Sequence, residues 1–216
     1  MKNKQTHYRN ASFLALFFVI LGYVVKFYPE QVRGFDHVIQ MTVRGSLPPL
    51  VTAFWSHITK LGEMVTVILF VGLIALFFYW KRWKAEALLI IGSLVLLGGA
   101  STALKLLYQR PRPTIEWLVH TIGFSFPSWH TASTMLLAGV LAIVVYQRIA
   151  APTLRYILQG GLILMAVLVA ISRIYVGVHY PTDIIGGWLL ALFILELCYP
   201  LYDRIRFTWR FQNKQK

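Results

Sequence analysis

Long apolar stretches separated by short polar segments dominate the pattern of this chain. Six such stretches occur, at residues 11–28, 64–80, 85–107, 132–146, 156–171 and 184–202. A transmembrane helix needs ~20 mostly apolar residues, with a range of about 17 to 25, and several stretches reach that length only with their flanking turns. The pattern predicts an all-α, polytopic membrane protein with six transmembrane helices in a single domain, residues 1–216.

A further, shorter helix is predicted between the first two spans. Apolar residues recur there at helical spacing, namely Leu47, Leu50, Val51, Phe54, Trp55 and Ile58. Ser46 is a candidate N-cap, and Pro48 and Pro49 suit the first turn. With His57 and Lys60 near its end, this segment is too short and too polar to span a bilayer. We expect a short amphipathic helix on the outer face, and the alternative is a seventh short span.

Lysine and arginine residues mark one side of the predicted membrane domain. They cluster at the N-terminus, in the KRWK turn, in the loop after the fourth span and in the tail, as Lys2, Lys4, Arg9, Lys81, Arg82, Lys84, Arg148, Arg155, Arg204, Arg206, Arg210, Lys214 and Lys216. The positive-inside rule places both termini in the cytoplasm, so residues 29–63, 108–131 and 172–183 face outward. Because no small-residue cleavage site follows the basic start, we expect an uncleaved first span in the cell membrane.

Composition agrees with a membrane protein and excludes several other classes. Of the 216 residues 57% are hydrophobic and 13% are charged, with a mean hydropathy of +0.62. Positive-inside topology explains most of the net charge of +13, so we expect no nucleic-acid partner, and nothing indicates an obligatory protein partner. Cys198 is the one cysteine, which leaves no intrachain disulfide and no thiolate metal site.

Three stretches on the predicted outer side carry groups suited to phosphate chemistry. They are residues 105–113 (KLLYQRPRP), 127–130 (PSWH) and 172–183 (SRIYVGVHYPTD). Charges beside the hydrocarbon region are costly, so Lys105, Arg112 and Arg173 should face a protein interior, where they can bind phosphate oxygens. The alternative for Lys105 is that it extends to lipid headgroups, and for Arg110, which has no matching partner, we prefer that interpretation.

The other two groups of residues suit anion binding and proton transfer. Ser128 and His130 open a predicted helix, whose free N–H groups form an anion site, although a histidine there is more often a cap. His179 and Asp183 lie four residues apart, so that the carboxylate can hold one imidazole nitrogen while the other faces substrate. A purely structural pair at the membrane surface remains the alternative. Gly177 would relieve crowding in the turn before His179.

Taken together, the three stretches resemble the signature of the type 2 phosphatidic acid phosphatase superfamily. That signature is a lysine, six residues and Arg-Pro, then Pro-Ser-Gly-His, then Ser-Arg-x-Tyr-x-Gly-x-His with an aspartate four residues after the histidine. The matching positions here are Lys105, Arg112, Pro113, Pro127, Ser128, His130, Ser172, Arg173, Tyr175, Gly177, His179 and Asp183. The resemblance covers residues 105–183, and the six-span layout agrees with it outside that range.

The resemblance implies a specific set of roles. His179 would be the nucleophile that forms a phosphohistidine, Asp183 would orient it, and His130 would protonate the leaving oxygen and then activate water. The phosphoryl oxygens would be bound by side chains and by backbone N–H groups near Trp129, the side chains being Lys105, Arg112, Ser128 and Arg173. No cofactor and no metal ion are expected, because lysine and arginine supply the positive charge.

One position departs from the family pattern. Trp129 stands where the family has glycine, which lets the backbone approach phosphate closely. An indole there could crowd the pocket, tilt His130, or turn outward toward lipid and leave the amide in place. From the sequence we expect lower activity than in a glycine version.

The resulting hypothesis is a lipid phosphatase that acts at the outer leaflet on phosphatidylglycerol phosphate or undecaprenyl diphosphate. Two alternatives share its chemistry, a lipid phosphotransferase and a vanadium-dependent haloperoxidase, and the transmembrane stretches disfavour the latter. Two others are not enzymes. Trp129 motivates a catalytically impaired lipid-phosphate binding protein, and a small transporter is disfavoured because the ionisable residues gather at one surface.

Overall fold

The computed structural model describes residues 4–215, so Lys2 and Lys216 of the charge pattern lie outside it. Within the described residues the chain forms eight α-helices, one short 3-10 helix and no strand. In chain order these are α1 (Lys4–Phe27), α2 (Pro29–Arg44), α3 (Pro49–Ile58), η1 (Thr59–Gly62), α4 (Met64–Trp80), α5 (Lys84–Tyr108), α6 (Trp129–Arg148), α7 (Pro152–Tyr175) and α8 (Pro181–Phe211). The predicted all-α class is confirmed.

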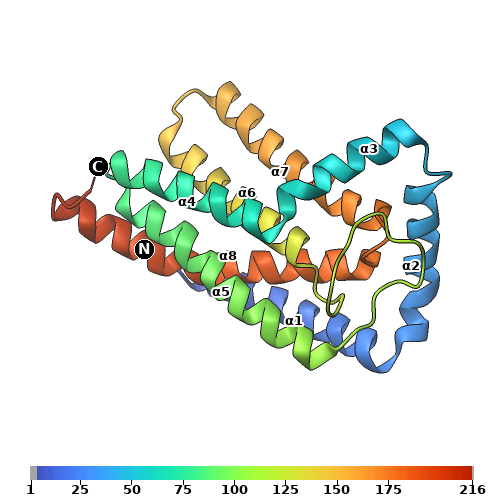
Figure 1. Ribbon diagram of the computed structural model, residues 1–216. Coiled ribbons are helices and arrows are strands. Elements are labelled where there is room, and N and C mark those ends of the chain that lie inside the picture. Colours follow the sequence, from blue (N-terminus) through green and yellow to red (C-terminus); the bar gives the residue numbers. More distant parts are fainter. Residues whose placement is uncertain (1–3, 216) are drawn as a thin grey trace.

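Five of the helices are each long and apolar enough to cross a membrane, namely α1, α5, α6, α7 and α8. A sixth span is provided if residues 49–62 and 64–80 are taken together, because these segments join with a bend of 55°. The layout therefore agrees with the six predicted spans. Figure 1 shows α2, α3 and the loop of residues 109–128 at one end of the bundle, here called the loop end, and both chain ends at the other, the terminal end.

The outer segment between α1 and α4 differs from its prediction. It contains two helices rather than one, and α3 begins at Pro49 with Pro48 as its N-cap, so the proposed cap at Ser46 is wrong. The helix α3 leads through η1 directly into α4. It is not a separate seventh span.

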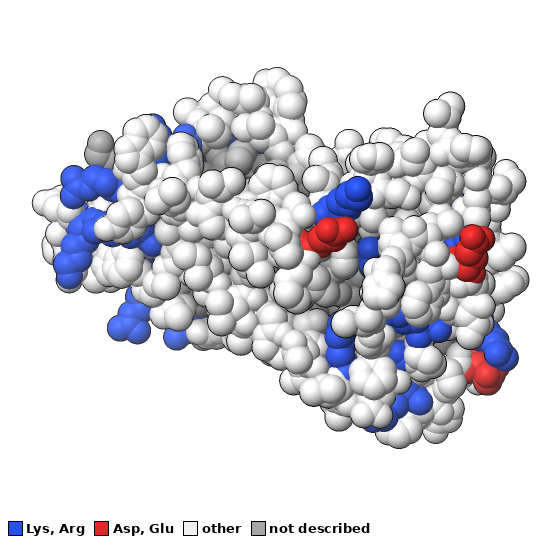
Figure 2. Space-filling model, in the orientation of Figure 1, with Lys and Arg blue, Asp and Glu red and all other residues white. Residues whose placement is uncertain are grey.

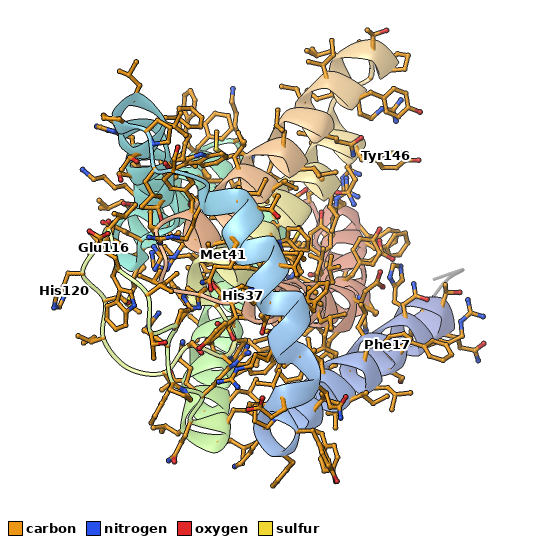
Figure 3. The ribbon with its side chains drawn as sticks, turned by 90° about the vertical axis from the view of Figure 1, so that its right-hand side faces the viewer. Phe17, His37, Met41, Glu116, His120 and Tyr146 are labelled. Carbon is orange, nitrogen blue, oxygen red and sulfur yellow. The ribbon has the colours of Figure 1, made fainter. Side chains whose placement is uncertain are left out.

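The missed helix α2 has an inverted amphipathic pattern. Asp36, Gln40 and Arg44 recur every four residues and are buried, whereas Phe35 and Met41 are exposed. This arrangement turns polar groups toward the protein and apolar groups toward the surroundings, as suits a helix that borders lipid. Figure 3 looks at the loop end and shows α2 lying across the front of the bundle, with the loop that carries Glu116 and His120 beside it.

The long helices pack around α8, which contacts α1, α5 and α6, while α7 packs against α6. At the terminal end the buried Glu86 of α5 accepts a hydrogen bond from Arg148 of α6 (2.5 Å) and forms an ion pair with Arg206 of α8 (3.2 Å). These two interactions join three helices. Figure 2 shows lysine and arginine gathered mostly toward the two ends, with a largely uncharged surface between them. Such a band is expected of a surface that faces hydrocarbon.

Candidate active site

Residues from all three predicted stretches meet at the loop end. Lys105 lies in the last turn of α5, Arg173 in the last turn of α7, and His179 in the turn between α7 and α8. Ser128 is the N-cap of α6, and the backbone N–H of Ser128 donates to the Asp183 carbonyl (3.2 Å). This bond joins the start of α6 to the start of α8, so the two histidines are carried by adjoining helix ends.

His179 and Asp183 form a buried pair. His179 Nδ1 lies 3.2 Å from Asp183 Oδ2, and these side chains are 2% and 0% exposed. The same carboxylate oxygen accepts the backbone N–H of Tyr180 (2.9 Å). With Nδ1 held by a carboxylate, the other ring nitrogen, Nε2, is the one that remains available to react.

Three cationic side chains lie near enough to His179 for their charges to act on its ring, namely Lys105, Arg112 and Arg173, here called the cation cluster. Arg112 Nη1 lies 3.3 Å from Nε2, and its guanidinium also donates to backbone carbonyls of the 109–128 loop and to the Val178 carbonyl. Lys105 Nζ donates to the carbonyl of Phe124 in the same loop (2.6 Å). Burial, reinforced by the charges of Arg173, Arg112 and Lys105, lowers the pKa of the His179 imidazole well below its ordinary value. The ring is therefore neutral near pH 7, the form that a nucleophile requires.

Arg173 and His130 reach the same place from α7 and α6. Arg173 is 2% exposed and donates to Thr59 Oγ1 (2.7 Å), which fixes its guanidinium against η1. His130 lies close enough to Arg173 for the guanidinium charge to act on its imidazole. It also packs against Gly62, where an added Cβ would come within 3.0 Å of the His130 Cβ. The bend between α3 and α4 thus forms one wall of the site.

The turn before His179 depends on Gly177. This residue has a φ of +81°, and a Cβ there would collide with the Arg44 guanidinium and with the Glu116 carbonyl. A side chain would be strained in this backbone conformation as well as crowded. The expectation that Gly177 relieves crowding in the turn agrees with this geometry.

The indole of Trp129 is partly buried and lies beside α5. It packs against an apolar cluster of α1, α5, α6 and α8, and a Cβ added at Gly98 of α5 would lie 3.9 Å from its ring. Its Nε1 is buried and has no acceptor among the described residues. Of the three arrangements considered from the sequence, crowding of the pocket is not what the structure shows, since the indole lies between helices.

We therefore expect Trp129→Gly to act mainly on stability. Removal of a fully buried large side chain costs about 3–5 kcal/mol. Trp129 is partly buried, so we expect a smaller loss, which should still lower the thermal unfolding midpoint in detergent far more than it changes kcat. The measurement is a thermal unfolding curve together with kcat for both proteins. A large rise in kcat with an unchanged midpoint would restore the interpretation that Trp129 impairs the site.

Arg110 corrects the sequence interpretation. It does not extend to lipid headgroups but is 9% exposed, and it bridges Asp183 Oδ1 (2.6 Å) and Asp36 Oδ2 (2.7 Å). The partner that the sequence failed to show is Asp36, on the unpredicted helix α2. Arg110 and Arg112 flank Pro111 in the segment after α5, yet their guanidinium groups bind different partners. Arg110 binds the two carboxylates, whereas Arg112 binds backbone carbonyls of the 109–128 loop and lies beside His179.

Comparison with known proteins agrees with this geometry. Residues 86–207, more than half of the chain, match the PAP2 superfamily. The phosphatidylglycerophosphatase B of Bacillus subtilis is 32% identical over 211 residues, which cover 93% of this chain and 97% of that protein. The chain belongs to the PAP2 superfamily.

Other PAP2 proteins are also similar. An undecaprenyl-diphosphatase of Sulfolobus acidocaldarius is 28% identical over 188 residues, covering 84% of this chain and 85% of the relative. The crystal structure of a transmembrane PAP2 type phosphatidylglycerolphosphate phosphatase from Bacillus subtilis superposes with a TM-score of 0.82 at 27% identity, covering 91% of this chain and 97% of that one. The predicted family, and with it the prediction of a lipid phosphatase in a membrane, is confirmed.

Proposed function

We propose that this PAP2 protein removes the terminal phosphate of a lipid phosphate or diphosphate at the outer leaflet, without a metal ion, through a phosphohistidine at His179. The observation that carries the proposal is the environment of the His179 ring. Its Nδ1 is held by a buried carboxylate, and its Nε2 lies beside Arg112 of the cation cluster. A neutral imidazole held in this way is suited to in-line attack on phosphorus.

The reaction would proceed in two displacements. In the first, His179 Nε2 attacks the phosphorus while His130 donates a proton to the departing lipid oxygen, and the P–O bond to the lipid breaks. In the second, His130 takes a proton from water, the water oxygen attacks the phosphohistidine, and inorganic phosphate leaves with the P–N bond broken. Throughout, the Asp183 carboxylate accepts a hydrogen bond from the Nδ1–H of His179 and stabilises the positive charge on the phosphorylated imidazole.

Charge on the phosphoryl oxygens would be stabilised by fixed groups of the protein. Lys105, Arg112 and Arg173 provide three cations, and Ser128 with the free N–H groups at the start of α6 provides hydrogen-bond donors. These groups come from four different segments of the chain, and the contact of Arg112 with His179 supports the proposed arrangement. Among the described residues, no three or more His, Cys, Asp or Glu side chains group together as metal ligands would.

The lowered pKa of His179 makes a prediction for the pH profile. A histidine with a lowered pKa stays neutral down to a lower pH. The fall of kcat/KM on the acid side that is due to the enzyme should therefore occur below the ordinary histidine pKa of about 6.5. The measurement is kcat/KM from about pH 4.5 to 8, corrected for the second ionisation of the substrate phosphate near pH 6. An enzyme limb at or above the ordinary histidine value contradicts this assignment.

The distribution of basic residues supports the proposed sidedness, and the relatives support the proposed substrate class. Lysine and arginine crowd the terminal end, which supports a cytoplasmic location there and an extracytoplasmic loop end. Relatives named phosphatidylglycerophosphatase B and undecaprenyl-diphosphatase support a substrate of one of these two classes. The apolar sides of the surrounding helices would let such an amphiphile approach with its headgroup at His179.

The experiment that tests the proposal is phosphate release by the purified protein in detergent. Phosphatidylglycerol phosphate, undecaprenyl diphosphate and phosphatidic acid are supplied separately, each with and without EDTA. We expect release from at least one of them, unchanged by EDTA because the cations of the site are side chains. Loss of activity in EDTA would overturn the metal-free mechanism, and binding without release in all three would favour a lipid-phosphate binding protein.

A further inference from the structure

A buried polar network connects the outer helix α2 to the carboxylate behind His179. Arg110 Nη1 donates to Asp183 Oδ1 (2.6 Å) and to Thr182 Oγ1 (2.7 Å), while its Nη2 donates to Asp36 Oδ2 (2.7 Å). Asp36, Arg110, Thr182 and Asp183 are all between 0% and 9% exposed. The side chains of the network are therefore largely shielded from solvent.

Asp36 also completes the start of α8. Its Oδ1 accepts the backbone N–H of Thr182 (2.9 Å), and its Oδ2 accepts the Thr182 hydroxyl (2.8 Å). Thr182 is the second residue of α8, where the backbone N–H has no partner within the helix. A carboxylate from α2 thus caps the helix that carries Asp183, and its negative charge is favourable at that end of the helix dipole.

The guanidinium is suited to this position because it can serve two carboxylates at once. Its planar fork places one nitrogen on each acid, and its carbon lies 4.1 Å from the centre of the Tyr180 ring, so its orientation is fixed by stacking as well. Burial alone would lower the pKa of Arg110, but Asp183 and Asp36 outweigh that effect and raise it. Arg110 is a permanent cation in the network.

The consequence for His179 follows from the two oxygens of Asp183. Oδ2 contacts His179 Nδ1 and the Tyr180 N–H, and Oδ1 is occupied by Arg110. If Arg110 were lost or displaced, the carboxylate could rotate away from the imidazole. Asp36 holds Arg110 from the opposite side and therefore acts on His179 through two intermediates.

We propose that Arg110 and Asp36 are positioning residues for the nucleophile, and that α2 is in this way a working part of the active site. The inference rests on the proposed function, since it concerns the role of Asp183 behind His179. Asp36 lies outside residues 86–207, the part of the chain that matches the PAP2 superfamily. A cavity of about 410 Å³ lies between α1, α2 and the 108–115 segment, and Asp36, Arg110 and Tyr180 are among the residues that line it. Along this cavity α2 is not in close contact with the rest of the protein, which leaves the Asp36 network to hold this part of it in place.

The test compares Asp36→Asn with the parent enzyme and with a matched control. Asparagine keeps the size of the side chain and an acceptor for the Thr182 N–H but removes the charge that holds Arg110. We expect kcat to fall about 10- to 100-fold, as is usual when an outer partner of a functional side chain is removed. KM and the inhibition constant of inorganic phosphate should match those of the parent, because the proposed phosphate-binding residues Lys105, Arg112 and Arg173 are unchanged.

The control is Glu30→Gln, which removes another carboxylate from the same helix. Glu30 is exposed and pairs with the exposed Arg33 (2.9 Å), and such surface pairs contribute little. We expect kcat, KM and the thermal unfolding midpoint to match those of the parent. If Glu30→Gln lowers kcat as much as Asp36→Asn does, the effect belongs to α2 in general and the positioning role is overturned.

A double-mutant cycle separates positioning from simple destabilisation. If Asp36 acts through Asp183, then Asp36→Asn should cost nothing further in an Asp183→Asn background, because residues that act as a unit are not additive. A full additional loss in that background, or an Asp36→Asn enzyme with the parent kcat, overturns the inference. Should Asp36→Asn fail to fold, Arg110→Lys takes its place in the cycle, since a lysine keeps the charge but cannot bridge both carboxylates.

The parent enzyme in the same assay keeps the two proposals apart. An active parent with an equally active Asp36→Asn variant overturns the positioning role and leaves the proposed function standing. A parent that releases phosphate from none of the lipids overturns the proposed function, and the positioning role that rests on it falls as well.

Discussion

Replacing His179 by alanine is expected to abolish phosphate release, with a loss of at least about 10³-fold in kcat, as is found when a covalent nucleophile is removed. No neighbouring group is placed to substitute for it. The Ser128 hydroxyl is within hydrogen-bond distance of Thr131 (3.1 Å) and is itself buried, and His130 lacks a carboxylate partner among the described residues. The remaining cations can bind phosphate but cannot attack it.

The measurement is the release of inorganic phosphate over a time long enough to detect one turnover per hour. Binding of inorganic phosphate is followed in parallel, because His179→Ala should retain it through Lys105, Arg112 and Arg173. A suitable control is His57→Ala, which changes an exposed histidine of α3 whose Nδ1 lies 2.7 Å from the Ala53 carbonyl of the same helix. Turnover in His179→Ala at more than a few hundredths of the parent rate would exclude His179 as the nucleophile.

The spans could be predicted from the sequence because hydrophobic length decides them almost alone. The helices α5, α6 and α7 contain the predicted stretches and extend them by at most four residues at either end, whereas α8 continues nine residues beyond its predicted end at residue 202. The grouping of Lys105, Arg112, His130 and His179 followed from a resemblance with many fixed positions. Spacing alone would not have placed residues from α5, α6, α7 and the α7–α8 turn around one imidazole, since that needs the packing of helices far apart in sequence.

The outer network was missed for a physical reason. A helix is normally recognised by an apolar face that turns inward, but α2 turns Asp36, Gln40 and Arg44 inward and leaves Phe35 exposed. Its polar residues therefore looked like those of a loop. Without α2 there was no partner for Arg110, 74 residues away, and an unpaired arginine beside a membrane is reasonably assigned to lipid headgroups.

Trp129 shows a second limit of the sequence. Its position beside His130 was known, yet the direction of its side chain depends on space that other helices provide. The indole lies beside Gly98 of α5, where an added Cβ would be in ordinary contact with the ring at 3.9 Å. The start of α6 is close to α8 because Gly187 has no side chain, since a Cβ there would lie 2.9 Å from the Ser128 carbonyl. Close approaches of this kind fix the site geometry and are not visible in one sequence.

Replacing His130 by alanine is expected to separate the two displacements of the reaction. General acid–base groups contribute about 10²- to 10⁴-fold, and His130 would serve both steps. A lipid diphosphate has a leaving group that is itself a phosphate and needs little protonation, so His179 can still be phosphorylated. The water of the second step still lacks its base. With that substrate the phosphoenzyme should accumulate, whereas a phosphate monoester, which leaves as an alkoxide, should hardly react at all.

The measurement for His130→Ala is labelling with a lipid diphosphate that carries radioactive terminal phosphate. We expect close to one equivalent of label per chain, lost in acid and retained in base, as the P–N bond of a phosphohistidine requires. The double variant His130→Ala/His179→Ala is the control and should remain unlabelled. Label that persists in the double variant would assign the nucleophile to another residue. His130 lies against Gly62 and near Arg173. Steady turnover by His130→Ala at the parent rate would nevertheless show that His130 transfers no proton in either step.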